Sequence, residues 1–337
     1  MSISGDGKSV AVGSLDERHL DVFKSEAGVW KSIGGNIVST SESIDIESSK
    51  IDVSLSYDGT KVAVGIPQEN EAAVYVLKTN GNWGRLGGSI TSENDDTDFG
   101  SSVSISSDGE FVAVGSPNSN GKKGMVMVMT YEDYAWIEVG KPIIGEVEGD
   151  MIGTSISLSD DGNVLAIGCP NHEMDNVKTG HVHIYKKSNT NGVYSWDLYG
   201  DEIMDTSGSG SEFGSSIDLS GDGTTVAIGA PQSNDGHGTA QVYRYLAAEE
   251  KWLMIGDING RMNEESGASV SISSDGSIVA IGANRFKKKG AVRVYEYICP
   301  TRPTVSNTKS SKSNAAITGF GYVVIQLLAV GFLNLRF

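Results

Sequence analysis

Oxygen-bearing side chains are densest in the segment Glu93-Asn94-Asp95-Asp96-Thr97-Asp98. Because calcium takes about six to eight oxygen ligands, Asp95, Asp96 and Asp98 are candidate ligands of a divalent cation. Runs of charged residues, however, are more often solvated linkers than binding sites. We therefore expect no metal and no other cofactor, with Ca²⁺ at these three aspartates as the alternative.

Two histidines, His181 and His183, lie two residues apart in the segment GHVHIYK. A β-strand would place both side chains on one face. With His172 or Asp175 from the preceding segment they form a second candidate metal site, because imidazole and carboxylate groups bind zinc. A half-exposed polar strand face explains the pair equally well, and no zinc-type spacing supports the metal.

The segments that follow a repeated Gly-x-Pro vary most in sequence, as binding loops often do. Their polar residues are the candidate ligand contacts, namely Asn118, Asn120, Asn171, Asn234 and Asp235. No G-x-S-x-G nucleophile motif is present. Paired catalytic carboxylates cannot be chosen from 43 acidic residues without geometry. The sequence therefore predicts no catalytic residue and no enzymatic activity.

A sequence motif close to S-x-S-x-D-G-x-x-V-A-V-G recurs six times along the chain. The secondary structure that it forms must position the candidate residues named above. Its Asp-Gly pairs begin at Asp6, Asp58, Asp108, Asp161, Asp222 and Asp275. In the third copy, residues 103–106 alternate apolar and small polar side chains and predict a strand. The Asp-Gly pair predicts a hairpin with a type I′ turn, in which both central residues have positive φ. A repeat of about 50 residues with four short apolar runs is typical of a β-propeller blade.

The five tryptophans support the same architecture. Each of Trp30, Trp83, Trp136, Trp196 and Trp252 occurs once per copy in a W-x-x-Φ-G motif, where Φ is a large apolar residue. An offset of three residues in a strand places Trp and Φ on opposite faces, as stacked blades require. The first copy begins within a strand, and the sixth lacks W-x-x-Φ-G. We predict an all-β propeller of about six four-stranded blades, complete or as part of a seven-bladed ring.

The fifth copy contains Phe213-Gly214, then Gly229-Ala230-Pro231 and the strand GTAQVYRY. This order resembles the FG-GAP repeat of integrin α-subunit propellers, and Phe99-Gly100 repeats its first half. The resemblance covers about residues 1–298 and implies an extracellular recognition module. Calcium-binding members of that family carry a D-x-D-x-D-G type loop, which here is reduced to a hairpin with a single aspartate, such as Asp108. The metal sites of the family therefore do not carry over.

Residues 1–298 form the predicted propeller, 299–314 a Ser-rich polar linker, and 315–337 a hydrophobic membrane-anchor tail with a C-terminal helix. The segment 315–335 carries no charge and would span roughly 30 Å as a helix, about the thickness of a bilayer core. A single transmembrane helix, a lipid-anchor signal and a tail anchor facing the cytosol remain open. The family resemblance favours a propeller outside the cell.

The formal net charge of −17 argues against a nucleic-acid partner, because binding to phosphates depends on Lys and Arg. We predict a non-catalytic, membrane-anchored propeller that binds a protein or glycan partner through one rim. An enzyme of the propeller hydrolase or lactonase type is the alternative. A structural cell-surface protein without a discrete ligand is the second alternative.

Overall fold

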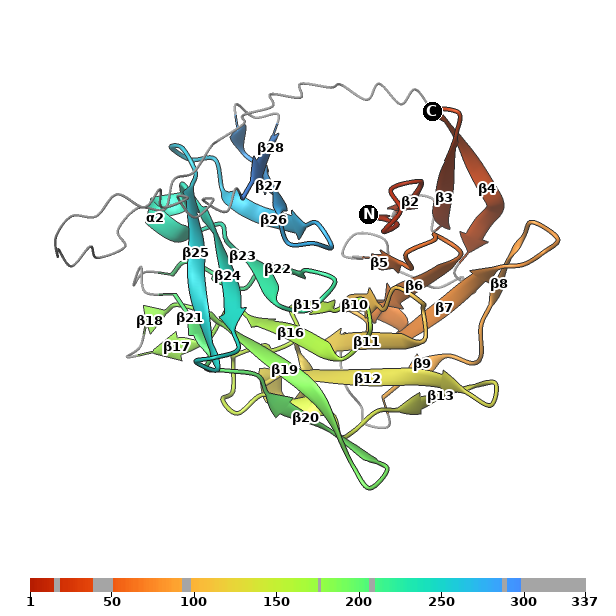
Figure 1. Cartoon of the computed structure of the whole chain (residues 1–337), viewed down its shortest axis with the longest axis horizontal. Coiled ribbons are helices and arrows are strands. Elements are labelled where there is room, and N and C mark those ends of the chain that lie inside the picture. Colours follow the sequence, from red (N-terminus) through yellow and green to blue (C-terminus); the bar gives the residue numbers. More distant parts are fainter. Residues whose placement is uncertain are drawn as a thin grey trace, which may run out of the picture.

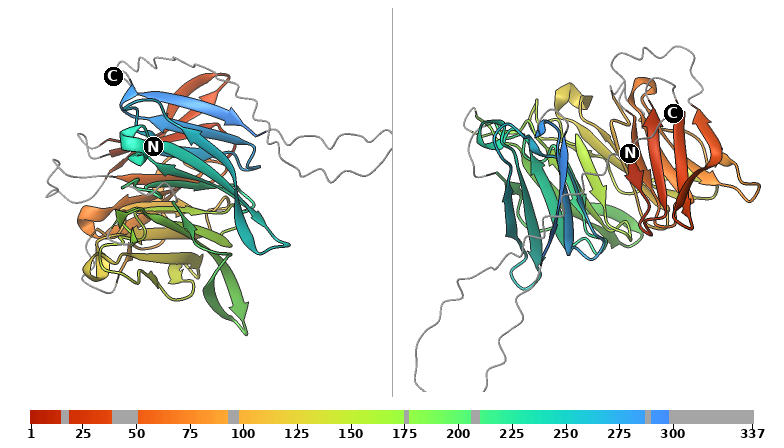
Figure 2. Two further views of the ribbon diagram at one scale, coloured as in Figure 1. Left: turned by 90° about the vertical axis from the view of Figure 1, so that its left-hand side faces the viewer. Right: turned by 90° about the horizontal axis from the view of Figure 1, so that it is seen from above.

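The computed structural model describes residues 1–14, 19–38, 51–92, 98–174, 177–205, 210–286 and 290–297. They form six antiparallel sheets that follow one another in chain order around a common axis, and one separate two-stranded hairpin (Figure 1). In the side views of Figure 2 the neighbouring sheets stand face to face. The prediction of an all-β, six-bladed propeller is confirmed. The predicted C-terminal helix and the linker lie outside the described residues.

Within each blade the main strands pair in sequence order from the axis outward, and in blades 2, 3 and 4 a further short strand pairs with the third strand. Blade 1 contains β1 (Ser2–Ile3), β2 (Ser9–Ser14), β3 (His19–Glu26) and β4 (Val29–Val38). Blade 2 contains β5 (Asp52–Leu55), β6 (Lys61–Ile66), the short η2 (Pro67–Glu69), β7 (Glu71–Leu77), β8 (Trp83–Arg85) and β9 (Ile90–Thr91). Blade 3 contains β10 (Ser102–Ile105), β11 (Phe111–Ser116), α1 (Ser119–Lys122), β12 (Met125–Glu132), β13 (Ala135–Glu138) and β14 (Ile143–Ile144).

Blade 4 contains β15 (Ser155–Leu158), β16 (Val164–Cys169), β19 (His181–Thr190), β20 (Val193–Leu198) and β21 (Ile203–Met204). A separate small hairpin, β17 (Glu173–Met174) and β18 (Val177–Lys178), extends from this blade between β16 and β19. Blade 5 contains β22 (Ser216–Leu219), β23 (Thr225–Ala230), α2 (Ser233–Gly236), β24 (Thr239–Leu246) and β25 (Lys251–Asn259). Blade 6 contains β26 (Ser266–Ile272), β27 (Ile278–Ala283) and β28 (Ala291–Glu296).

The turn between the first two strands differs from the predicted type I′ turn. In all six copies the glycine of the Asp-Gly pair has φ between 64° and 69°, whereas the aspartate stays outside the positive-φ region. The N–H of Gly109 donates to the carbonyl of Ser106 at 2.9 Å, so the glycine closes a turn rather than occupying its centre. The carboxylate of Asp108 accepts hydrogen bonds from the Ser106 hydroxyl and the Glu110 N–H, at 2.6 and 2.9 Å. The type I′ prediction is wrong because one left-handed glycine is enough to close this longer loop.

The W-x-x-Φ-G motif joins each blade to the blade before it. The indole Nε1 of Trp136 donates to the carbonyl of Leu86, which is the Φ residue of the preceding blade. The same bond recurs from Trp83 to Ile33, from Trp196 to Val139 and from Trp252 to Tyr199. Trp136 packs with the core shared by blades 2 and 3, and Val139 with the core shared by blades 3 and 4. The prediction that the motif covers both faces of the sheet is confirmed.

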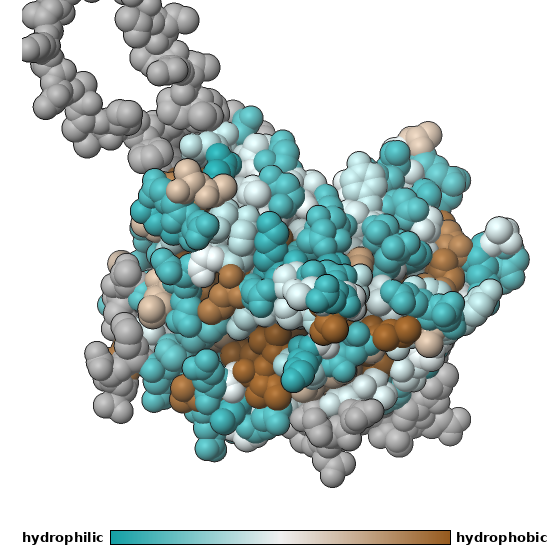
Figure 3. Space-filling view, turned by 60° about the horizontal axis from the view of Figure 1, so that its bottom comes forward, coloured by the Kyte–Doolittle hydropathy of each residue, from teal (hydrophilic) through white to brown (hydrophobic). Residues whose placement is uncertain are grey.

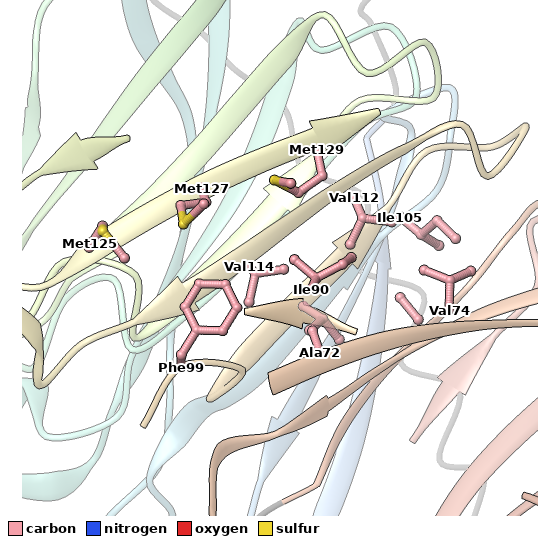
Figure 4. Packing of buried hydrophobic residues seen from close by; sticks show 12 residues of the cluster. Ala72, Val74, Ile90, Phe99, Ile105, Val112, Val114, Met125, Met127 and Met129 are labelled. Carbon is pink, nitrogen blue, oxygen red and sulfur yellow. The ribbon is translucent and has the colours of Figure 1, made fainter. Parts of the chain in front are cut away.

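Apolar side chains between neighbouring blades form the core. Between blades 2 and 3, Met125, Met127 and Met129 lie along one face of β12 toward Phe99 and Val114 (Figure 4). Near the axis, backbone N–H groups of each first strand donate to a side chain of the preceding blade. These bonds run from Leu55, Ile105, Leu158, Leu219 and Ile272 to Ser2, Ser54, Ser104, Ser157 and Asp218, respectively. The repeated S-x-S-x-D-G-x-x-V-A-V-G motif therefore specifies the contacts between blades as well as the strands.

The first and last blades are not joined by strand pairing in the part of the chain that the structure describes. Blade 6 has three described strands and no counterpart of the W-x-x-Φ-G strand. The face of the propeller in Figure 3 is mostly hydrophilic, with apolar surface gathered in a band across its middle. Within the described ranges, no helix is long and apolar enough to span a membrane. Membrane attachment through residues 315–337 stays a prediction.

Candidate functional site

The loops between second and third strands and the connections between blades lie on the same rim, because successive strands run in opposite directions. Two of the predicted candidates meet there. The carboxylate of Asp98 accepts a hydrogen bond from the side-chain amide of Asn118. The other two candidate calcium ligands, Asp95 and Asp96, lie outside the described residues, and the Ca²⁺ alternative stays a prediction.

The remaining predicted ligand contacts lie on the same rim but do not converge. Asn120 has left-handed backbone geometry within α1, and Asn234 and Asp235 have it within α2. The amide of Asn234 donates to the side-chain oxygen of Asn259, and that of Asn171 contacts the sulfur of Met151. These side chains are therefore distributed over blades 3, 4 and 5 and do not form one site.

A cluster of chemically active groups lies instead between blades 3 and 4. In the antiparallel pair of β16 and β19, Cys169 stands directly opposite His181. His183 follows two residues later, so the thiol and both imidazoles share one face of the sheet. The three ligand-type atoms lie within 4.8 Å of one another. We call Cys169, His172, His181, His183 and Asp150 the histidine cluster.

The other two members come from loops on the same rim. Asp150 belongs to the connection that leads from blade 3 into blade 4, and His172 follows β16. The Nδ1 atom of His172 lies 3.1 Å from Oδ1 of Asp150 and hydrogen-bonds to it. The His172 ring also stacks on His181, with ring centroids 4.0 Å apart. The sequence analysis named His172 with His181 and His183 as a candidate metal site, and in the structure the three rings lie side by side. The fourth candidate of that set, Asp175, lies outside the described residues.

Burial keeps the inner members of the cluster uncharged. It lowers the pKa of His181 to about 2, with smaller contributions from His183 and His172. Burial also lowers the pKa of His183, although the nearby Glu202 opposes this shift. The pKa of the Cys169 thiol is raised well above its usual value by burial first, and then by Asp150 and Glu202. A neutral imidazole keeps a nitrogen lone pair that can bind a metal.

The sequence analysis missed Cys169 and Asp150. Departure from the repeat is the signal that identifies the cysteine, because its counterparts in the other blades are Ser14, Ile66, Ser116, Ala230 and Ala283. The position of His181 holds His19, Glu71, Met125, Thr239 and Ala291 in the other blades, so it varies throughout and gives no such signal. Repeated positions maintain the fold, so residues that break the repeat on one rim are candidates for chemistry.

A cavity of about 390 Å³ lies between blades 5 and 6, lined in part by Ile255, Val279, Arg293 and Tyr295. Ile255 is the Φ residue of blade 5, which in the other blades faces the tryptophan of the next blade. The cavity thus occupies the position where the sixth blade lacks a W-x-x-Φ-G strand. We therefore interpret the cavity as a gap left by the missing strand. Among its described lining residues, no group of metal-ligand or nucleophilic side chains converges on one point.

Comparisons with known proteins identify the fold. No family model matches the chain, and no curated protein matches it. Among solved structures, a functionally unknown protein of Desulfotomaculum acetoxidans shares 15% sequence identity with a TM-score of 0.58, over 87% of this chain and 80% of its own. The periplasmic gluconolactonase of Pseudomonas aeruginosa shares 13% with a TM-score of 0.56, over 88% and 80%. A provisionally named 6-phosphogluconolactonase of Bacteroides uniformis shares 11% with a TM-score of 0.55, over 88% and 80%.

These neighbours correct the functional prediction. Gluconolactonases among the similar propellers count against a non-catalytic module for binding a protein or glycan, and against the expectation of no enzymatic activity. They favour the alternative of a hydrolase or lactonase. At 11–17% identity the likeness itself shows the propeller fold, and the reaction of this chain remains a matter for proposal. The resemblance to FG-GAP repeats stays a prediction.

Proposed function

We propose that this protein is a hydrolase of the lactonase type and that its reaction takes place at the histidine cluster. The observation that carries the proposal is the hydrogen bond between His172 Nδ1 and Asp150 Oδ1 on the rim between two blades. A carboxylate bonded to one ring nitrogen orients the imidazole and stabilises its protonated form, which leaves the other nitrogen to act as a base. The similar fold of the gluconolactonases supports the choice of substrate class.

The reaction uses one water molecule. In this proposal His172 Nε2 removes a proton from the water as its oxygen attacks the carbonyl carbon of the lactone. The ring C–O bond then breaks, and the leaving alkoxide takes the proton back from the imidazolium. The product is the open-chain hydroxy acid, so no oxidant, reductant or second substrate is needed. Asp150 keeps the His172 ring in position throughout and accepts no proton.

An uncharged sugar lactone suits the site better than a phosphorylated one. Three carboxylates lie close enough to His183 to raise its pKa, namely Glu202, Glu146 and Asp150. The formal net charge of the whole chain is −17. Both features disfavour a substrate that carries a phosphate dianion, because like charges repel in a partly buried site.

Hydrolysis of D-glucono-1,5-lactone by the full-length protein tests the proposal, with the spontaneous rate subtracted. We expect His172→Gln and Asp150→Asn each to lower kcat/KM by about 100-fold or more, which is typical of losing a general base. His237→Gln is the matched control, because His237 lies on the corresponding loop of blade 5. Unchanged turnover in His172→Gln, or no turnover of any lactone or ester by the unmodified protein, would contradict the proposal.

A further inference from the structure

The pairing of His172 with Asp150 leaves His181 unexplained. The residue is buried, with a relative exposure of 4%. Within the described part of the chain, neither of its ring nitrogens has a hydrogen-bond partner. The Nε2 atom of the neighbouring His183 also lacks one and lies 3.5 Å from Glu202 Oε1. Buried nitrogens without partners are rare in folded proteins, and a bound ion is one established explanation for them.

We propose that Cys169, His181 and His183 form a binding site for Zn²⁺ or a similar divalent transition-metal ion. Thiolate sulfur and imidazole nitrogen are the ligands that zinc prefers in proteins. The three candidate ligand atoms lie within 4.8 Å of one another, and ligand atoms around tetrahedral zinc are separated by about 3.5 Å. Binding of the ion therefore requires side-chain rotations that bring these atoms closer together. The inference goes beyond lactone hydrolysis and does not depend on it.

The geometry favours these three ligands over the other close set, which is Asp150, His172 and His181. An imidazole binds a metal in the plane of its ring. The rings of His172 and His181 are stacked, with centroids 4.0 Å apart and an interplanar angle of 29°, so an ion in the plane of one ring lies well out of the plane of the other. His181 and His183 are inclined by 48°. In addition, Asp150 already holds Nδ1 of His172.

The surroundings of the three ligands suit a metal. The hydroxyl of Tyr185 lies 3.2 Å from Nδ1 of His183, so Nδ1–H can donate to it while Nε2 remains available as a ligand. Hydrogen bonds to the second ring nitrogen orient metal-binding histidines and fix their tautomer. Asp150 and Glu202 act electrostatically on Cys169 and supply negative charge near the ion. The site is reached through His172 and His183, whose side chains are 20% and 16% exposed.

Three protein ligands leave a fourth position for water, as in many zinc sites. When the ion binds, the Cys169 thiol loses its proton to solvent and the S–H bond is replaced by an S–metal bond. The thiolate supplies a spectroscopic signature that imidazole and carboxylate ligands lack. It therefore separates the proposed ligand set from the alternative without any measurement of activity.

The experiment uses untagged, chelator-treated full-length protein, titrated separately with Zn²⁺ and with Co²⁺. We expect one equivalent of Zn²⁺ to bind, and the Co²⁺ form to show a thiolate-to-metal charge-transfer band in the near ultraviolet. Cys169→Ser and His183→Gln should each weaken Zn²⁺ binding by at least about 100-fold, and Cys169→Ser should abolish the band. His172→Gln and His237→Gln should retain both binding and band. Circular dichroism and thermal melting check that each variant folds.

Three results would overturn the inference. They are failure of the unmodified protein to bind either ion, binding that survives both Cys169→Ser and His183→Gln, and a Co²⁺ complex without a thiolate band. The first and third tests need only the unmodified protein. They therefore decide the question even if a variant fails to fold. Lactonase activity is not a readout here, so metal binding without turnover would refute only the proposed function.

Discussion

The indole Nε1 of Trp136 donates a hydrogen bond of 2.8 Å to the carbonyl oxygen of Leu86, fifty positions earlier in the chain. The two residues occupy the first and fourth positions of successive W-x-x-Φ-G motifs. The glycine after Leu86 has φ of 73°, and a Cβ built on it would lie 3.1 Å from the Trp136 ring. The motifs of blades 1 to 4 therefore each contact the tryptophan of the next blade through the Φ carbonyl and the glycine.

Replacing Trp136 by Phe should lower the free energy of unfolding by about 1–2 kcal/mol, because a partly buried carbonyl loses its donor and the smaller ring leaves a gap. Urea denaturation measures this change. Trp30→Phe is the matched control, since Trp30 carries the same motif in blade 1 but is 47% exposed. We expect it to change stability by less than about 0.5 kcal/mol. Equal effects of the two substitutions would show that the contact between blades does not determine stability.

Gly168→Ala should destabilise the protein by more than about 2 kcal/mol. A Cβ at this position would lie 2.0 Å from the backbone carbonyl oxygen of Gly214 in the next blade, and backbone cannot rotate away as a side chain can. Gly88→Ala is the control, because no atom lies within 4 Å of its added Cβ and its φ is outside the left-handed region. Thermal melting of both variants tests the prediction, and a Gly168→Ala protein as stable as the control would refute it.

Phe213→Ala should lower the free energy of unfolding by about 3–5 kcal/mol, which is typical of a large cavity in a core. Phe213 is fully buried and packs with Val182, Ile228 and Ala230 between blades 4 and 5. Tyr134→Ala provides the comparison, since Tyr134 is 90% exposed at the tip of a hairpin. A loss of less than about 1 kcal/mol at Phe213 in chemical denaturation would mean that the inter-blade core relaxes around the cavity.

The stability of the protein should depend on pH through Asp218, near the axis. Burial raises its pKa to about 6 from 3.8, although Ile272 N–H and the Ser271 hydroxyl donate to its carboxylate. Between about pH 4 and pH 6 the folded protein therefore holds a proton that the unfolded chain releases. The contribution of this group to stability is fully present below about pH 4 and is lost as pH rises through 6.

Asp218→Asn should remove this part of the pH dependence, which urea denaturation from pH 3 to pH 8 would measure. Asp275→Asn is a control of opposite sign. Hydrogen bonds from Ser273, and to a smaller extent from Ser277, lower the pKa of the exposed Asp275 to about 2. The contribution of Asp275 to folding stability is therefore present above about pH 4 and is lost as pH falls toward 2. An unaltered slope between pH 4 and pH 6 in Asp218→Asn would refute the assignment to Asp218.

Much of the fold could be predicted from sequence because its determinants are local and repeated. Alternation within residues 103–106, the glycine after Asp108 and the spacing from Trp136 to Val139 each act over a few residues. These features predicted the strands, the blade number and the two-sided role of the motif. The turn type was predicted wrongly, because an Asp-Gly pair is compatible with more than one loop length and each of them places a glycine at positive φ.

The histidine cluster required the tertiary structure. Strand periodicity places His181 and His183 on one face, and the sequence alone determines that much. The pairing register of β16 and β19 places Cys169 opposite His181. The packing of blade 4 against blade 3 brings Asp150 within hydrogen-bonding distance of His172. These are long-range relationships, formed when hydrophobic faces pack and exclude water. Short-range sequence patterns carry the strands and turns of the propeller, whereas the packing of its blades determines which groups meet on the rim.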